Sequence, residues 1–240
     1  MFSLRFLGRG AAFNVTEGNT AACVKNGEEL LLLDCGETVF YQLMKQHLLD
    51  GVKRLTVAVS HLHSDHCGSL GSLGHYCRYA LGIRMTLLVP REEAYVQELG
   101  QLLRIFGNDE NSVEMIPAED WTGMEGIDSL RYVPTEHADG MHCFSFELQT
   151  REGAVFYSAD TRTTETLQAF LRAHEDIAGI YMDATDADYP GNVHLPVTRL
   201  IEVVPQELRG RTVLMHLNGP WAAEMGKAMG FGIAEGAFAE

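Results

Sequence analysis

His61-Leu62-His63-Ser64-Asp65-His66 carries more information about this protein than any other part of the chain. Three imidazoles and one carboxylate lie within six residues, and these side chains bind zinc and similar divalent ions. Their close spacing lets alternate side chains face two neighbouring ions. Because the chain has only ten histidines, chance is a poor explanation for the pattern, and we predict a metal-binding loop rather than a solvated loop without function.

Two apolar strands are predicted to support this loop. Leu55, Val57 and Val59 alternate along a strand that leads directly into the histidines, and a strand end holds ligands more rigidly than a long loop does. Asp34 follows a second, fully apolar strand, Leu30–Leu33. An unpaired carboxylate would be costly there, so Asp34 is predicted to accept hydrogen bonds and to support the metal loop from beneath.

Several later strands also end in a histidine or an aspartate. The predicted strands are Leu130–Val133, Ala154–Ser158, Ile177–Met182 and Arg211–Met215. The residues at or just beyond these ends are His137, Asp160, Asp183 and His216. Any one of them alone would more often hydrogen-bond to a loop than bind a metal. Together they predict that one edge of a sheet sandwich assembles a single site.

The rest of the chain alternates strands with helices, which indicates one α/β domain over residues 1–240. Asn26-Gly27 between two apolar runs is typical of a hairpin turn. Helical periodicity is expected over Thr38–Leu49, Gly68–Gly82 and Ala94–Phe106, with His47 on the apolar stripe of the first. Further strands are expected at Met85–Val89, Val113–Ile116 and Cys143–Leu148, and Gly230–Ala234 forms a last strand or a turn. A hydrophobic content of 46% is enough for one large core.

Composition limits the partners and the compartment. The formal net charge of −15, without a basic stripe, argues against long nucleic acid. Without an apolar run long enough for a signal or membrane segment, we expect a soluble cytoplasmic protein that does not bind membranes. The odd number of five cysteines, without Cys-x-x-Cys pairs, favours reduced thiols. Cys67 follows His66 directly but is expected to pack in the core.

With these residues in view, the sequence resembles the metallo-β-lactamase fold superfamily. FLGRGAAF, LLLDCG, SHLHSDHCGSL, PTEHADG, YSADTR and VLMHL occur in the order of that family's motifs and cover essentially the whole chain. The resemblance implies a four-layer αββα sandwich with a dinuclear metal site, usually Zn²⁺ and sometimes Mn²⁺ or Fe. It implies that one metal is held by His61, His63, His137 and Asp160. It implies that the other is held by Asp65, His66 and His216, with Asp160 bridging.

Within the superfamily, the sequence is most similar to ribonuclease Z and its small relatives that hydrolyse cyclic nucleotides. YSADTR resembles a Gly-Asp-Thr-Arg segment, with Ala159 replacing the glycine, and YMDATDADYPGNVHLPV resembles a His-Glu-Ala-Thr segment followed by a distal histidine. The comparison implies that His194 donates a proton to the leaving oxygen and that Asp183 positions it. Tyr181-Met182-Asp183 departs from the family by lacking the first histidine and by carrying Asp for Glu.

The tRNA-gripping arm of ribonuclease Z has no counterpart in the sequence. Only 23 positions separate His137 from Asp160, and a predicted hairpin occupies them. The missing arm and the net acidity predict a small phosphodiester substrate, such as a 3′,5′-cyclic nucleotide. Two ions about 3.5–4 Å apart can share an activated water, so we expect a metal-bridging hydroxide to attack phosphorus. Asp65 would orient that water or accept its proton, and His194 would protonate the departing oxygen.

Other functions stay open at this stage. The same site could hydrolyse a lactone, an ester or a thioester, because a fold does not determine the function built on it. A tRNA 3′ processing endonuclease and a non-catalytic nucleotide-binding protein are weaker alternatives. Tyr189, Trp221 and Phe231 could stack on a base, although core packing is commoner for each, and Arg162 could contact phosphate or form an ion pair. A homodimer is expected from the resemblance.

Overall fold

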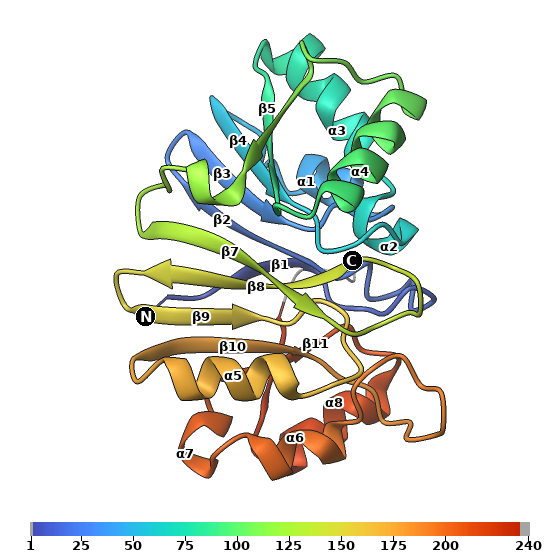
Figure 1. Ribbon diagram of the computed structural model, residues 1–240, viewed down its shortest axis with the longest axis vertical. Coiled ribbons are helices and arrows are strands. Elements are labelled where there is room, and N and C mark those ends of the chain that lie inside the picture. The colour runs from blue at the N-terminus through green and yellow to red at the C-terminus, as the bar shows by residue number, and fades with distance from the viewer. Residues whose placement is uncertain (1, 236–240) are drawn as a thin grey trace.

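Two six-stranded sheets pack face to face between two layers of helices in the computed structural model, which describes residues 2–235 (Figure 1). The strand order is β1-β2-β3-β4-β5-β6 in the N-terminal sheet and β12-β11-β10-β9-β8-β7 in the C-terminal sheet. This arrangement confirms the predicted α/β class and the four-layer αββα sandwich. None of the helices within residues 2–235 has both the length and the apolar character needed to cross a bilayer.

The N-terminal sheet combines an antiparallel edge with a parallel centre. Its strands are β1 (Arg5–Gly8), β2 (Ala21–Asn26), β3 (Glu29–Leu33), β4 (Arg54–Ala58), β5 (Met85–Val89) and β6 (Val113–Pro117). The pairs β1–β2 and β2–β3 are antiparallel, and β3 to β6 are parallel. The predicted hairpin turn is confirmed, since Asn26 pairs with Glu29 across Gly27, whose φ of 56° suits glycine. After Glu29, β3 is entirely apolar because the sheet is covered on both faces.

Helices α1 to α4 cover the outer face of this sheet (Figure 1). They are α1 (Val39–Lys45), α2 (Ser64–Cys67), α3 (Leu70–Tyr76), the π-helix η1 (Cys77–Leu81) and α4 (Glu93–Ile105), and a 3₁₀ turn, η2 (Ala118–Asp120), follows β6. The helix expected over residues 68–82 is confirmed in two parts, α3 and η1. The helix expected over residues 38–49 is shorter than predicted, because it ends at Lys45 and His47 adopts a left-handed conformation with a φ of 53°. The prediction that His47 lies on the apolar stripe of this helix was wrong: it follows the helix, and its side chain is exposed beside Asp50.

The C-terminal sheet mirrors the first. Its strands are β7 (Ile127–Thr135), β8 (Cys143–Thr150), β9 (Gly153–Tyr157), β10 (Ile177–Asp183), β11 (Thr212–Met215) and β12 (Gly232–Ile233). β7, β8 and β9 are antiparallel neighbours, and β9 to β12 run parallel. The outer face is covered by helices that the sequence patterns did not reveal, namely α5 (Glu165–Ala173), α6 (Val197–Val203), α7 (Gln206–Arg209) and α8 (Pro220–Ala228).

Two apolar cores lie on opposite faces of the C-terminal sheet, and β9 shows how the sequence serves both. Val155 and Tyr157 belong to the large core shared with the N-terminal half. Ala154 and Phe156, at alternate positions, pack into the smaller core beneath α5, α6 and α8. This division follows from the two-residue period of a strand, in which successive side chains point to opposite faces. Both faces of β9 are therefore buried.

Candidate metal centre

The carboxyl ends of parallel strands from both sheets meet at one edge of the sandwich. His61 follows β4, Asp160 follows β9, Asp183 closes β10 and His216 follows β11. His137 lies just beyond β7. The structure therefore brings the strand-end residues together with the loop histidines, and the candidate ligand atoms form three groups in which all atoms lie within 4.8 Å of one another.

The first group consists of His61, His63, His137 and Asp160. His63 Nδ1 lies 3.0 Å from His61 Nε2 and 3.3 Å from His137 Nε2. Asp160 Oδ2 lies 3.9 Å from His61 Nε2 and 3.5 Å from His137 Nε2. The edge of a zinc tetrahedron with bonds of about 2.0–2.1 Å measures roughly 3.3 Å, so these separations fit one metal ion.

The second group consists of Asp65, His66, Asp160 and His216. His66 Nε2 lies 3.4 Å from Asp65 Oδ2 and 3.2 Å from Asp160 Oδ1. His216 Nε2 lies 3.3 Å from each of the same two carboxylates. All four separations agree with the tetrahedral edge of roughly 3.3 Å. Asp160 supplies Oδ2 to the first group and Oδ1 to the second, as a bridging carboxylate would.

Buried polar atoms without hydrogen-bond partners also support a metal site here. His66 Nε2 and Asp160 Oδ1 are buried without a hydrogen-bond partner among the described residues, although both face the second group. A buried polar group normally has a partner, and leaving one unsatisfied costs about 1–3 kcal/mol. A divalent ion at the second group would satisfy both atoms. Together with the separations in the first group, this means that the residues present fit a dinuclear centre.

Asp34 supports the loop as the sequence predicts. Its Oδ1 accepts a hydrogen bond from the Ser60 backbone N–H at 2.7 Å, and its Oδ2 accepts one from the Ser60 hydroxyl at 3.0 Å. The same Oδ2 lies 2.9 Å from His66 Nδ1, which directs His66 Nε2 toward the candidate metal position. Ser60 Oγ also lies 3.0 Å from His61 Nδ1. Ser60 was not predicted from the sequence, although a serine directly before the first histidine, at the end of a buried strand, was a usable signal.

His194 and Asp183 form a third arrangement beside the two groups. His194 Nδ1 donates to Asp183 Oδ2 over 2.9 Å, and the same oxygen accepts the Thr161 backbone N–H over 3.1 Å. Asp183 Oδ1 lies 3.5 Å from His216 Nδ1. Ser158, also missed from sequence, accepts a hydrogen bond from the Asp183 backbone N–H at 2.7 Å and so fixes the end of β10.

Left-handed backbone conformations occur repeatedly at the site. Among residues 2–235, the non-glycine residues with positive φ include Asp34 (64°), Ala159 (48°) and His216 (54°). The conformation costs an L-residue roughly 1–2 kcal/mol. Ala159 stands where the ribonuclease Z segment has glycine, so the structure explains that preference: the turn that presents Asp160 requires a positive φ.

The local charges set the protonation of the site. Burial, followed by the positive charge on His66, lowers the pKa of His61 well below its usual value, which keeps the imidazole neutral and able to coordinate a cation. Burial opposes protonation of His66 and His216 as well, but the surrounding carboxylates prevail and raise both pKa values, that of His216 to about 10. A cation that binds these imidazoles must displace a proton, as at other histidine sites.

The remaining candidates fall into distinct places. Cys67 is buried, as predicted, and its thiol donates to the His63 carbonyl at 3.2 Å. Arg162 forms ion pairs with Glu136 and Asp139, which favours the expected ion pair over a phosphate contact. Phe231 is buried in the smaller core and is excluded as a base platform, whereas Tyr189 and Trp221 are exposed.

Comparison with known proteins places the chain in a family. The model of the Anti-Pycsar protein Apyc1 family matches residues 2–236. The chain belongs to this family. Anti-Pycsar protein Apyc1 of Saccharibacillus brassicae is 30% identical over 224 residues, covering 89% of each chain. The protein of the same name from Bacillus phage BSP38 is 28% identical, covering 89% of this chain and 88% of its own.

Ribonuclease Z and other metallo-β-lactamase fold proteins are also similar to this member of the Apyc1 family. Ribonuclease Z of Methanosarcina mazei is 26% identical, over 94% of this chain and 77% of its own. YhfI from Bacillus subtilis superposes with a TM-score of 0.75 at 17% identity, covering 98% of this chain and 95% of its own. Zn²⁺-bound PqqB from Methylobacterium extorquens gives 0.70 at 15% identity, covering 98% of both chains. These structures confirm the metallo-β-lactamase fold.

Proposed function

We propose that this metal-dependent hydrolase is a phosphodiesterase that opens the phosphodiester ring of 3′,5′-cyclic nucleotides. The observation that carries the proposal is the position of His194, which lies beside both candidate metal groups while its Nδ1 is engaged by Asp183. A hydrolase that expels an alkoxide needs an acid at this place. Membership in the Apyc1 family supports cyclic nucleotides as the substrate class.

The metal content is part of the proposal. Two divalent ions, Zn²⁺ in the first instance and Mn²⁺ or Fe as alternatives, would be held by His61, His63, His137, Asp65, His66, His216 and the shared Asp160. When bound, such ions supply a water of lowered pKa and neutralise negative charge on the phosphoryl oxygens. The exclusively nitrogen and carboxylate donor set suits these metals.

His194 and Asp65 are proposed to handle the protons. Burial disfavours a charged His194, but Asp183 outweighs this effect and raises the pKa of His194, which favours the imidazolium that can protonate the departing oxygen. Burial also disfavours an ionised Asp65, yet His216 and His66 hold its pKa far below the usual range. The low pKa supports an ionised Asp65 that orients a water, and it makes Asp65 a weak base for the alternative role of accepting the proton.

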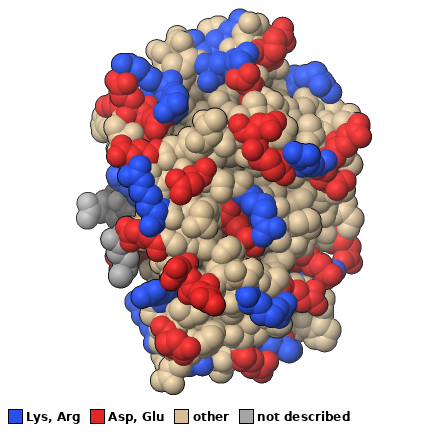
Figure 2. Space-filling model, turned by 60° about the vertical axis from the view of Figure 1, so that its left-hand side comes forward, with Lys and Arg blue, Asp and Glu red and all other residues tan. Residues whose placement is uncertain are grey.

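The surface and the hairpin favour a small substrate. β8 ends at Thr150 and β9 begins at Gly153, so a tight turn joins the two strands where ribonuclease Z carries its arm. On the face shown in Figure 2, lysines and arginines are interspersed with acidic residues and form no continuous basic track. With a net charge of −15, this surface is poorly suited to a long polyanion.

A homodimer is proposed alongside the activity, because two-fold dimers are the commonest homo-oligomers and the ribonuclease Z resemblance implies one. Light scattering coupled to size exclusion should give twice the 26.6 kDa mass of one chain. A mass of one chain at micromolar concentration would contradict the dimer but not the activity.

Metal analysis combined with a substrate panel tests the function. The purified protein should contain about two ions per chain and hydrolyse 3′,5′-cyclic nucleotides and bis-p-nitrophenyl phosphate, with no turnover of a lactone or a β-lactam. Turnover of the lactone alone would retain the site and reject the substrate class. A protein that binds no metal after incubation with Zn²⁺ or Mn²⁺ would refute the proposed centre.

A further inference from the structure

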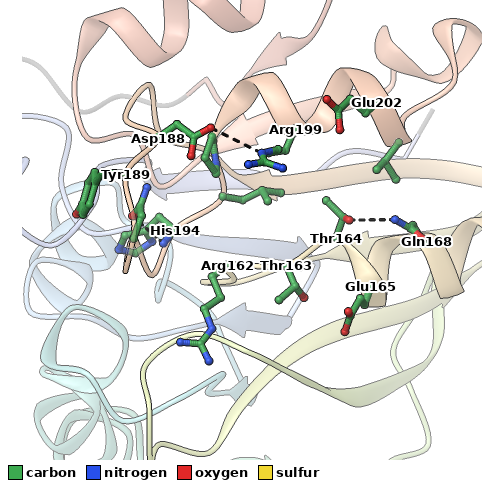
Figure 3. Close-up of a pocket in the computed structure, with 14 residues that line it drawn as sticks. Arg162, Thr163, Thr164, Glu165, Gln168, Asp188, Tyr189, His194, Arg199 and Glu202 are labelled. Atoms are coloured by element: carbon green, nitrogen blue, oxygen red, sulfur yellow. Dashed lines mark hydrogen bonds and ion pairs between the residues drawn. The ribbon is translucent and has the colours of Figure 1, made fainter.

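A pocket lined by His194 contains none of the seven proposed metal ligands. Its volume is about 420 Å³, within the range of roughly 300–1,000 Å³ that small-ligand sites occupy. One wall is the segment from Arg162 to Gln168 at the start of α5, and the other is formed by α6 and the loop that joins β10 to it. Tyr189 and His194 lie together at one end, and Thr164 and Gln168 lie at the other (Figure 3).

We infer that this pocket binds the nucleoside of the substrate and that Tyr189 stacks on its base, an inference that rests on the proposed function. If His194 protonates the departing oxygen, the group attached to that oxygen must lie on the His194 side of the phosphate. In a cyclic nucleotide that group is the ribose with its base. His194 lines the pocket, so a nucleoside on the His194 side of the phosphate would enter it.

The Tyr189 ring is presented by a rigid turn. The Tyr189 backbone carbonyl accepts a hydrogen bond from the Asn192 backbone N–H at 3.1 Å. Pro190 and Gly191 occupy the centre of this turn, and the φ of 86° at Gly191 matches type II. Asn192 then connects this turn to the proposed acid, because its Oδ1 accepts the His194 backbone N–H at 3.1 Å. Tyr189 as a whole residue is 58% exposed, and a tyrosine can stack on a base at little entropic cost.

The charge of the pocket limits the ligand to one nucleoside. Its lining contains the guanidinium groups of Arg162 and Arg199 but the carboxylates of Glu165, Asp188 and Glu202. Both arginines already have acidic partners: Arg162 pairs with Glu136 and Asp139, and Arg199 lies 3.7 Å from Asp188. An additional phosphate would meet a net negative wall, so the pocket suits a neutral base and ribose rather than a second nucleotide.

Equilibrium binding separates base recognition from phosphate recognition. The metal-loaded protein is titrated calorimetrically with adenosine 5′-monophosphate, uridine 5′-monophosphate and ribose 5-phosphate, which lacks a base. Tyr189→Ala should weaken the binding of both nucleotides about tenfold, since base–aromatic stacking contributes a factor of this order, and should leave the binding of ribose 5-phosphate unchanged. Tyr189→Phe should bind like the wild type. Tyr79→Ala is the matched control, because Tyr79 is also exposed but lies on η1 in the opposite helical layer.

Kinetics distinguish the failure of this inference from the failure of the proposed function. Tyr189→Ala should raise KM for cyclic nucleotides about tenfold, with a smaller change in kcat. Equal loss of nucleotide and ribose 5-phosphate binding, or unchanged KM with normal wild-type turnover, would overturn the stacking role alone. Wild-type protein that binds nucleotides no tighter than ribose 5-phosphate would also overturn it. A wild-type enzyme without cyclic nucleotide turnover would refute the proposed function.

Discussion

The two sheets contribute to the candidate metal centre in different ways. The N-terminal sheet provides four of the proposed ligands from one short loop, His61 to His66, directly after β4. The C-terminal sheet provides three, and each follows a different strand: His137, Asp160 and His216. The local cluster indicates the ligand chemistry, whereas the dispersed residues complete the separate ligand groups, and Asp160 is the one residue common to all of those found among residues 2–235.

Replacing Asp160 should have the largest effect. Asp160→Ala removes a ligand from both groups, so we expect loss of both ions and a fall in turnover of roughly 10⁴-fold or more. His63→Ala, from the local loop, affects the first group only and should retain about one ion. Mass-spectrometric metal analysis, with circular dichroism to verify folding, measures the difference. Equal metal content in the two variants would show that Asp160 does not bridge.

Removing the proposed acid should have the next largest effect. His194→Ala should lower turnover 10²–10⁴-fold, the usual scale for loss of a general acid, while the metal content stays at the wild-type level. His47→Ala serves as the matched control, because His47 is exposed in the turn after α1. Steady-state kinetics with a cyclic nucleotide and metal analysis provide the two readouts. Unchanged kcat would remove His194 from the mechanism.

Two buried serines allow a matched test of how each sheet supports the site. Ser60→Ala removes the hydroxyl that contacts Asp34 and His61, and metal affinity should fall 10–100-fold, as for other residues that orient ligands. Ser158→Ala removes a contact to the Asp183 backbone instead, so its main effect should be on kcat through His194. Competition with a fluorescent chelator measures affinity. A larger affinity loss in Ser158→Ala would reverse this assignment.

The smallest expected effect is on stability at alkaline pH. Burial raises the pKa of Cys35, Cys67 and Cys77 in the N-terminal half to about 12, and that of Cys143 in the C-terminal half to about 11. Between pH 9 and these values the unfolded chain binds fewer protons than the folded chain, so the free energy of unfolding should decrease as pH rises.

Urea denaturation at pH 8, 9 and 10 measures this decrease, with Cys35→Ser and Cys143→Ser to compare the halves. Each substitution should reduce the slope by a similar amount, because both thiols stay largely protonated in the folded chain up to pH 10. A slope that is unaffected by either substitution would assign the decrease to the buried tyrosines, such as Tyr95 and Tyr157, whose pKa values burial also raises.

The sequence was sufficient where the information is local. The contiguous histidines, the Asn26-Gly27 hairpin and the strands ending in Asp or His follow from side-chain chemistry and a two-residue period, and the structure agrees with each. Helices α5 to α8 were missed, and the helix predicted over residues 38–49 was too long. Helical periodicity is weak in short elements, and tertiary packing determines where they begin and end.

What the sequence determined by itself is the ligand chemistry: imidazoles and carboxylates at strand ends can be recognised without coordinates. Only the tertiary structure shows that these residues meet, because the pairing of β9, β10 and β11 brings Asp160, Asp183 and His216 to one edge. It alone also placed Tyr189 beside His194, through a turn whose hydrogen bonds depend on backbone geometry. Distances between residues far apart in the chain are set by sheet register and core packing, which no local pattern encodes.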